Sequence, residues 1–475
     1  MRAGGEAIHS CRSAPGAKIA HNRRCGSENR KAAKKIGKSS RACATGVPCN
    51  TLCEQLMGDV TMKIVSTIAA AAVIATCAAT APAFAFQSEN TLRIGGMWAI
   101  TGGVALTGKG ALNLSRLAVD EINAAGGVKI GGKQVKLELF AYDEACKEQE
   151  GMALLSRLDE VDKVLFTLGP TCSGTAEPLF NTLQKKLDDP SDKGRQFLFF
   201  TDTASKFGLA KISPWVFRNT VDEPAMYQLI VKHLKETQPE LKTVSVAWEP
   251  DFAHSASTWK QIIKPTFEKD SHYQIVEVVE WGWQATDYTA QVAKLAKANA
   301  DVYVTLTHEP TTCASFQEMA KQGVKPKIIV AISSLAGGTV IVGCPKLAEG
   351  MVVPTNFAPV TPKAVALEKK AWDLYKAESN LDRSHTAYEI IYLVKNLIEE
   401  TAIENTPESL AADRRKLRDA LATVRSFDGM IGPIAINPET HPTKPREAEK
   451  ELFLLQVKGG QWAVVHSPPG FNPSR

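Results

Sequence analysis

The sequence predicts an α/β fold with two Rossmann-like lobes, and three observations support this prediction. Short apolar runs alternate with amphipathic helical stretches from Thr91 to Thr201, as expected for a parallel sheet covered by helices. The alternation restarts after Pro224, which implies a second α/β unit of similar size. The C-terminal segment then turns to strands. Two independent tandem domains would show a similar pattern, so the pattern alone leaves that alternative open.

The first unit shows both helical and strand periodicity. Leu114, Leu117, Ala118 and Ile122 share one face of a predicted helix, which Gly126-Gly127 ends. Apolar and polar residues alternate over 135–141, which predicts a strand, and the apolar runs 164–168 and 197–200 are typical of buried parallel strands.

The second unit repeats this order. Strands are predicted at 243–248, 274–281, 301–306 and 327–331, and helices at 255–267, 288–298, 312–322, 362–378 and 384–400. The final strands are predicted at 430–436, 451–457 and 461–465. Neither unit carries the glycine fingerprint of a dinucleotide site, so the fold class assigns no function by itself.

The first 86 residues are predicted to lie outside this fold. Residues 62–86 have a short positive start, an alanine-rich apolar run and the small-x-small end Ala83-Phe84-Ala85, which together predict a secretory signal peptide. A membrane anchor is the alternative. Residues 1–61 are interpreted as an extension from a mis-assigned start, with Met62 as the initiator. A basic arm that binds nucleic acid is the alternative there.

The net charge is different when residues 1–86 are left out. The whole chain has a net charge of +5, but residues 87–475 contain 44 Lys and Arg against 47 Asp and Glu, which gives −3. This balance gives no electrostatic reason to expect nucleic acid or an anionic membrane as a partner.

Motifs for catalysis and cofactors are incomplete or absent. Gly103 to Lys109 match the spacing of a nucleotide-binding loop, but Gly110 stands where Ser or Thr would bind Mg²⁺. The sequence has no H-E-x-x-H and no G-x-S-x-G, and its cysteines after residue 86 are not spaced as a zinc site. We therefore expect no cofactor, no metal and no enzymatic activity.

Four cysteines follow residue 86, namely Cys146, Cys172, Cys313 and Cys344. An even number in an exported chain suggests disulfides. Four cysteines allow three connectivities, and the residues alone do not choose among them.

Three predicted strands are followed by loops rich in small and hydroxyl residues, at 95–103, 169–175 and 201–205. Ligands of parallel α/β sheets bind at the carboxyl ends of the strands, where these loops should meet. Hydroxyl and backbone N–H groups can bind a carboxylate. Ser173 and Thr175 open a helix, so a plain N-cap is the alternative for them.

From about Asn90 to about Val465 the chain resembles the leucine/isoleucine/valine-binding protein family, a group of type I periplasmic binding proteins. The residues that carry the resemblance are Leu92-Arg-Ile-Gly-Gly-Met97, Ala118-Val-Asp-Glu-Ile-Asn-Ala-Ala-Gly-Gly127, Tyr142-Asp-Glu-Ala-Cys146, Gly169-Pro-Thr-Cys-Ser173 and Glu349-Gly-Met351. It implies two lobes joined by three crossover strands, with lobe 1 at 90–218 plus 357–432 and lobe 2 at 219–356 plus 433–466.

The resemblance also implies a disulfide and part of a site. Cys146 and Cys172 correspond to a bridge of the family, which leaves Cys313 and Cys344 as a second pair. Ser173, Thr203 and Ser205 fall where the family binds the carboxylate and amine of its ligand, and Phe252 falls where many members have a tyrosine.

The chain departs from the amino-acid-binding pattern at Ser334, where such members have an acid for the α-ammonium. An amino-acid ligand is then expected only if Glu309 or Asp202 replaces that acid, because a buried ammonium needs a paired charge. Trp98 and Phe252 favour an aromatic or aliphatic acid as the competing ligand. A core position is the alternative for Trp98.

The expected function is that of the periplasmic substrate-binding component of an ABC importer, with membrane permease subunits as partners. A small carboxylate-bearing solute would be captured by closure of the lobes about hinges near 215–222, 351–357 and 430–437. A ligand sensor of the same fold and, less favoured, an exported enzyme are the alternatives.

Overall fold

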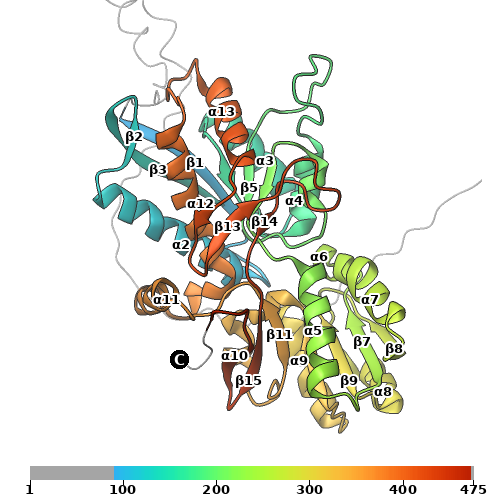
Figure 1. Ribbon diagram of the computed structural model, residues 1–475. Helices are drawn as coiled ribbons and strands as arrows, with labels where there is room; N and C mark the ends of the chain where they lie inside the picture. Colours follow the sequence, from blue (N-terminus) through green and yellow to red (C-terminus); the bar gives the residue numbers. More distant parts are fainter. Residues whose placement is uncertain (1–89, 472–475) are drawn as a thin grey trace, which may run out of the picture. The chain divides into compact units, whose positions relative to one another are not determined.

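The computed structural model describes residues 90–471. The predicted signal peptide at 62–86 and the extension at 1–61 lie outside the described residues. No helix within 90–471 is long and apolar enough to cross a membrane. Two sheets with mostly parallel strands organise this part of the chain into two lobes, each with its own hydrophobic core (Figure 1).

The sheet of the first lobe has the strand order β2-β3-β1-β4-β5-β6. All of its pairings are parallel except that of β2 with β3. Its strands are β1 (Thr91–Trp98), β2 (Val128–Ile130), β3 (Lys133–Asp143), β4 (Thr167–Leu168), β5 (Phe199–Thr201) and β6 (Val216–Arg218). The apolar runs 164–168 and 197–200 are buried as predicted, but only two residues in each have strand conformation.

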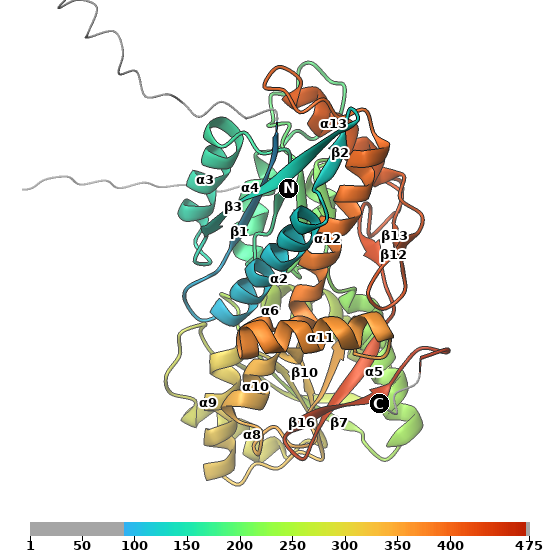
Figure 2. The same cartoon turned by 90° about the vertical axis from the view of Figure 1, so that its left-hand side faces the viewer.

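The α-helices of this lobe contribute residues to its core. They are α2 (Ala105–Ala124), α3 (Glu148–Ser156), α4 (Ser173–Asn181), α11 (Pro362–Tyr375), α12 (Leu381–Glu400) and α13 (Leu410–Ala422). The central helix α12 lies beside α2 and is buried along most of its length (Figure 2). Helix α13 was not predicted, because it buries Asp413, Arg414 and Arg418 beside Leu417 and Leu421 and so lacks an apolar stripe.

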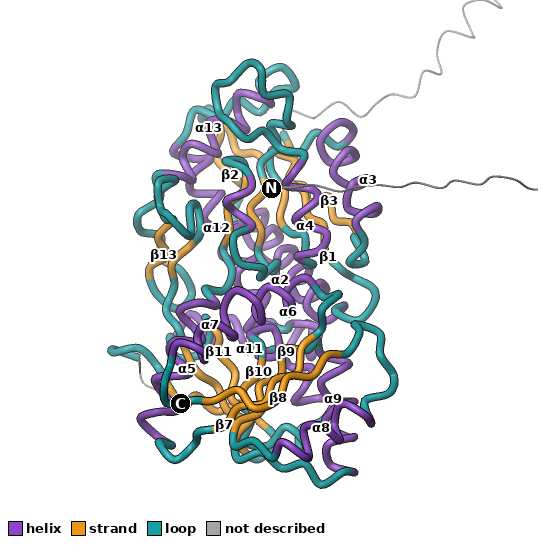
Figure 3. Tube along the Cα trace, turned by 90° about the vertical axis from the view of Figure 1, so that its right-hand side faces the viewer, coloured by secondary structure: helices purple, strands orange, loops and turns teal. Residues whose placement is uncertain are grey.

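The sheet of the second lobe has the order β16-β15-β11-β10-β9-β7-β8. Figure 3 labels its strands β7 to β11, drawn in orange. Its strands are β7 (Thr243–Trp248), β8 (Gln274–Glu280), β9 (Val302–Leu306), β10 (Ile328–Ala331), β11 (Val352–Thr355), β15 (Phe453–Lys458) and β16 (Gln461–His466). Strands β15 and β16 run antiparallel to their neighbours. The prediction of β7 over 243–248 is confirmed to the residue.

The helices of the second lobe are α5 (Glu223–Thr237), α6 (Ala253–Ser257), α7 (Lys264–Lys269), α8 (Thr289–Ala298), α9 (Glu309–Lys321) and α10 (Gly338–Gly343). The single helix predicted over 255–267 is helical throughout, but a π-helical turn at Thr258–Ile263 separates α6 from α7.

The chain crosses between the lobes three times, at 219–222, 356–361 and 450–452. The third crossing differs from the expected hinge at 430–437 and the expected lobe boundary at 433. Strands β12 (Phe427–Asp428), β13 (Pro433–Ile436) and β14 (Ala448–Glu449) pair with one another in a small separate sheet. Because Ile434, Ile436 and Ala448 join the first core, the chain enters the second sheet only at Phe453.

The crossing segments contact one another and α12 through buried polar groups. The Arg218 guanidinium forms an ion pair with Glu447 at 2.7 Å, and Asn356 donates to the Thr220 carbonyl at 3.3 Å. Lys450 donates to the Glu389 carboxylate at 2.5 Å. These contacts join the first crossing to the second and the third crossing to α12.

Candidate ligand-binding site

A cavity lies where loops from the carboxyl ends of both sheets meet. The first lobe contributes Val104, Thr107, Thr171, Cys172, Ser173, Thr203, Ser205 and Arg383, and the second contributes Phe252, His254, His308, Glu309 and Ser334. These residues follow β1, β4, β5, β7, β9 and β10 or begin α12. The cavity has a volume of about 30 Å³, so in this conformation it holds no more than a few water molecules.

The structure brings together six of the eight residues expected in the site. The residues that line the cavity are Ser173, Thr203, Ser205, Phe252, Glu309 and Ser334. Trp98 and Thr175 do not line it. Trp98 is fully buried in the first core and donates through Nε1 to Asp202 Oδ2 at 2.9 Å. Thr175 faces Glu144, to which its hydroxyl donates at 2.7 Å.

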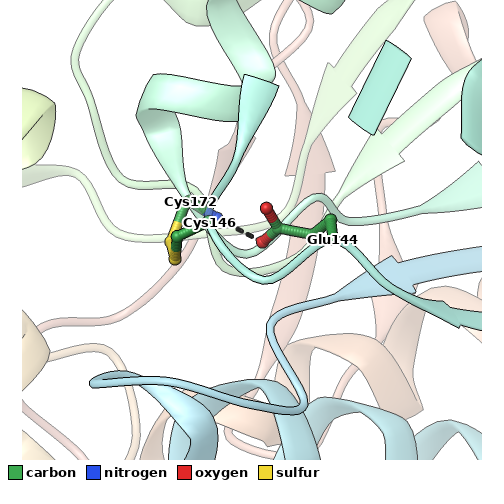
Figure 4. Close-up of side chains that lie close together, drawn as sticks. All are labelled: Glu144, Cys146 and Cys172. Atoms are coloured by element: carbon green, nitrogen blue, oxygen red, sulfur yellow. Dashed lines mark hydrogen bonds between the residues drawn. A yellow bond between two sulfur atoms is a disulfide. The ribbon is translucent and has the colours of Figure 1, made fainter. Parts of the chain in front are cut away.

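Both expected disulfides are present. Cys146 pairs with Cys172 and Cys313 pairs with Cys344, with Cα–Cα distances of 5.2 and 5.6 Å. Figure 4 shows Glu144 beside the first pair, where its carboxylate accepts from the Cys172 backbone N–H at 3.1 Å. Because the two sulfur atoms are bonded to each other, this group does not offer the ligands of a metal site.

The hydroxyl groups of the first lobe have defined partners. Ser205 donates to the Thr203 carbonyl at 2.9 Å, and Ser173 accepts from the Lys206 backbone N–H at 3.0 Å. Helix α4 begins at Ser173, but the residue before it, Cys172, occupies the N-cap position. The Ser173 hydroxyl therefore links two strand-end loops.

The cavity contains a permanent cation that the sequence did not reveal. Arg383 lies in the first turn of α12, is 4% exposed, and donates through Nη2 to the Thr203 carbonyl at 3.0 Å and to Ser205 Oγ at 2.5 Å. Its Nε has no hydrogen-bond partner within residues 90–471. Burial lowers the pKa of Arg383, and the neighbouring Asp382 carboxylate opposes this effect.

An acidic side chain faces the same cavity from the second lobe. Glu309 begins α9, is 3% exposed, and accepts from Thr107 Oγ1 at 3.3 Å. Burial raises its pKa to about 7. Asp202, the other acid considered from the sequence, does not line the cavity, because Trp98 and Thr203 donate to its two oxygens.

The second lobe also presents two histidines that are oriented by buried carboxylates. His254 Nε2 lies 2.7 Å from Glu223 Oε1, and His308 Nδ1 lies 2.7 Å from Glu249 Oε1. Trp283 stacks on His308, with ring centroids 4.1 Å apart and planes 8° apart. Phe252 contacts both rings, so this wall of the site is largely aromatic.

Comparisons with known proteins agree with this fold. Residues 91–461 match the model of a family described as periplasmic binding protein. The leucine-specific-binding protein of Salmonella typhimurium is 22% identical over 334 residues, which cover 65% of this chain and 83% of that protein. The Leu/Ile/Val-binding protein homolog 7 of Brucella abortus is 25% identical, over 56% of this chain and 63% of that protein.

Solved structures share the fold at low identity. The branched-chain amino acid transporter substrate-binding protein LivJ of Streptococcus pneumoniae, in complex with isoleucine, superposes with a TM-score of 0.64 at 21% identity and covers 80% of this chain and 100% of LivJ. An ABC transporter solute-binding protein of R. palustris, in complex with 4-hydroxybenzoate, gives 0.64 at 19% identity, with 80% and 96% covered. These likenesses show the fold and leave the ligand open.

Proposed function

Because the chain belongs to the type I periplasmic binding proteins of the branched-chain amino acid family, we propose that it is the substrate-binding component of an ABC importer. Its solute carries a carboxylate and is a branched-chain or other amino acid, or an aromatic or aliphatic acid. The protein acts in the periplasm and delivers the solute to permease subunits in the inner membrane.

One observation carries this proposal. The cavity described above is lined from both lobes, and its first-lobe side holds the hydroxyls of Ser173, Thr203 and Ser205 beside the Arg383 guanidinium. Hydroxyl and guanidinium donors are the groups that bind carboxylates in proteins. Phe252 on the opposite side offers an apolar surface to the body of the solute.

The proposed mechanism is capture by closure of the lobes. A cavity of about 30 Å³ is smaller than an amino acid or an aromatic acid, so the solute enters when the lobes separate. The crossings at 219–222, 356–361 and 450–452 absorb the rotation. The closed, loaded form is then the one that the permease recognises.

A thermal-shift screen tests the proposal. The full chain is heated with amino acids, aromatic acids, short aliphatic acids and, as controls, the methyl esters of the same compounds. A solute present at about a hundred times its Kd should add about 2.7 kcal/mol to the free energy of unfolding, and its ester should add much less. If no carboxylate raises the melting temperature, the proposed solute class is wrong. Reduced uptake of the bound solute by cells that lack the protein would support the importer role.

A further inference from the structure

Two side chains of opposite charge face the cavity from different lobes. Arg383 comes from α12 of the first lobe and Glu309 from α9 of the second, and each is at least nine-tenths buried. A buried charge is costly unless it is paired and hydrogen-bonded. The presence of these two buried charged groups in the cavity therefore requires an explanation.

The Arg383 guanidinium is held in place by two hydrogen bonds, and its Nε–H is still available to a ligand. Its Nη2 is held by the Thr203 carbonyl and the Ser205 hydroxyl, both of which belong to residues that line the cavity. Its Nε has no partner within residues 90–471. A guanidinium with a free Nε–H in a site rich in hydroxyls is suited to a carboxylate, which can accept from that N–H and from the neighbouring hydroxyl groups.

Glu309 places a hydrogen-bond acceptor on the second-lobe side of the cavity, which favours a hydrogen-bond donor of the solute there. Its Oε1 accepts from Thr107 Oγ1 at 3.3 Å, and Thr107 accepts in turn from Asn380 Nδ2 at 3.2 Å. The long contact from Thr107 leaves the carboxylate with capacity for a stronger donor. Ser334, which also lines the cavity, adds no charge.

We infer that Arg383 anchors the carboxylate of the solute and that Glu309 selects solutes with a hydrogen-bond donor elsewhere in the molecule. The solute class is a monocarboxylate that bears an amine, amide or hydroxyl group. This inference rests on the proposed function and makes it more specific.

A ranking of solutes follows from the two charges. A monocarboxylate without a donor satisfies Arg383 but gives the buried Glu309 carboxylate no donor stronger than the Thr107 hydroxyl. A dicarboxylate places a second negative charge beside Glu309. The donor-bearing acid satisfies both sides and should bind more tightly than either.

Titration calorimetry on the full chain with three sets of compounds tests the ranking. Each set compares a donor-bearing acid with a plain acid and a diacid of similar size: glycine with acetate and malonate, β-alanine with propionate and succinate, and 4-aminobenzoate with benzoate and terephthalate. The measurements are made at pH 8, above the pKa of about 7 that burial gives Glu309. In at least one set the donor-bearing acid should bind about 10-fold more tightly than both relatives.

Two variants separate the roles of the two residues. Arg383→Gln should weaken binding of the preferred acid about 10- to 100-fold, as expected for loss of a hydrogen bond to a charged group. Glu309→Gln should reduce the difference between the donor-bearing acid and its diacid, because the repulsion is removed. Arg414→Gln is the matched control, since Arg414 is a buried arginine of the first lobe that pairs with Asp159 and does not line the cavity. It should lower stability and leave the affinity unchanged.

The outcomes distinguish the inference from the proposed function. If the wild type binds a carboxylate and Arg383→Gln binds it equally well, the inference is wrong and the proposed function stands. If plain acids or diacids bind as tightly as the donor-bearing acids in every set that binds, the role of Glu309 is wrong. If Arg383→Gln does not fold, the wild-type ranking and Glu309→Gln decide. If the wild type binds no carboxylate at all, the proposed function fails and the inference fails with it.

Discussion

Glu144 connects two loops of the first lobe through its buried carboxylate. It accepts from the Cys172 backbone N–H and from the Thr175 hydroxyl, and it thereby supports the segment that presents Ser173 to the cavity. Burial raises the pKa of Glu144 to about 7, although its hydrogen bonds act in the opposite direction. The sequence shows Glu144 only as part of a family motif, because its burial depends on two loops that meet in space.

The raised pKa predicts a dependence of stability on pH. Between pH 4.5 and 7 the folded protein holds a proton at Glu144 that the unfolded chain has released, so the free energy of unfolding falls as the pH rises through this window. Glu144→Gln should make this fall smaller, by up to about 3 kcal/mol. Urea unfolding at pH 5 and pH 7.5 measures it.

Other buried acids keep part of this dependence in the variant. Burial likewise raises the pKa of Glu309 and of Asp382 to about 7, so the slope should decrease and not disappear. Glu148→Gln, at an exposed position, is the control and should behave as the wild type does. Equal slopes for Glu144→Gln and wild type would contradict the prediction.

At the scale of elements, the crossing segments are held against α12 by buried polar contacts. Glu389 of α12 accepts from Lys450 in the third crossing, from Asn219 Nδ2 in the first at 3.2 Å, and from the Met430 N–H at 2.8 Å. Lys450 and Glu389 are 4% and 1% exposed. One carboxylate therefore connects two of the three crossings to a core helix.

Removal of one member of this pair should be costly. Lys450→Met leaves the Glu389 charge buried without its cation, which should lower the free energy of unfolding by about 3–5 kcal/mol. The double variant Lys450→Met with Glu389→Met should recover part of that loss, because no unpaired charge remains. Urea unfolding measures both. Lys444→Met, at a more exposed pair with Asp222, should cost about 1 kcal/mol or less, and a similar cost at Lys450 would refute the argument.

At the scale of the whole described chain, the two lobes contact each other beside the cavity. A Cβ atom placed at Gly174 of α4 would lie 3.8 Å from the Cβ of Ala253 in α6. This separation equals the usual Cβ–Cβ distance of a disulfide. A cysteine pair at these positions would join the lobes in the conformation described here.

The crosslink tests whether the solute needs the lobes to separate. In Gly174→Cys with Ala253→Cys, the oxidised protein should exchange solute at least about 10-fold more slowly than the wild type, because the lobes cannot open. Mild reduction should restore exchange. The single variant Gly174→Cys, treated in the same way, controls for effects on the native disulfides. Equal exchange rates before and after oxidation would mean that the lobes need not open.

The candidate site was predictable to the extent that it lies in loops after strands. Ser173, Thr203 and Ser205 were expected because parallel strands end at a common edge, and Phe252 was expected from the family resemblance; all four line the cavity. Arg383 was missed because it enters the cavity from a helix and lies 180 and 178 residues further along the chain than its partners Thr203 and Ser205. Trp98 was placed in the site by proximity in sequence, but its indole donates to Asp202 within the core.

The sequence by itself determined the α/β class, the order of the elements and most of their positions, because side-chain periodicity is a local property of the chain. The family resemblance extended this to the two lobes and the pairing of four cysteines. The tertiary structure alone decided where the third crossing lies, since Ile434, Ile436 and Ala448 could pack against either core. It also decided the charge of the cavity, because the environment of Arg383 and Glu309 is made by residues distant in sequence. Burial and pairing between distant segments have no local signal, and they are what gives this site its chemistry.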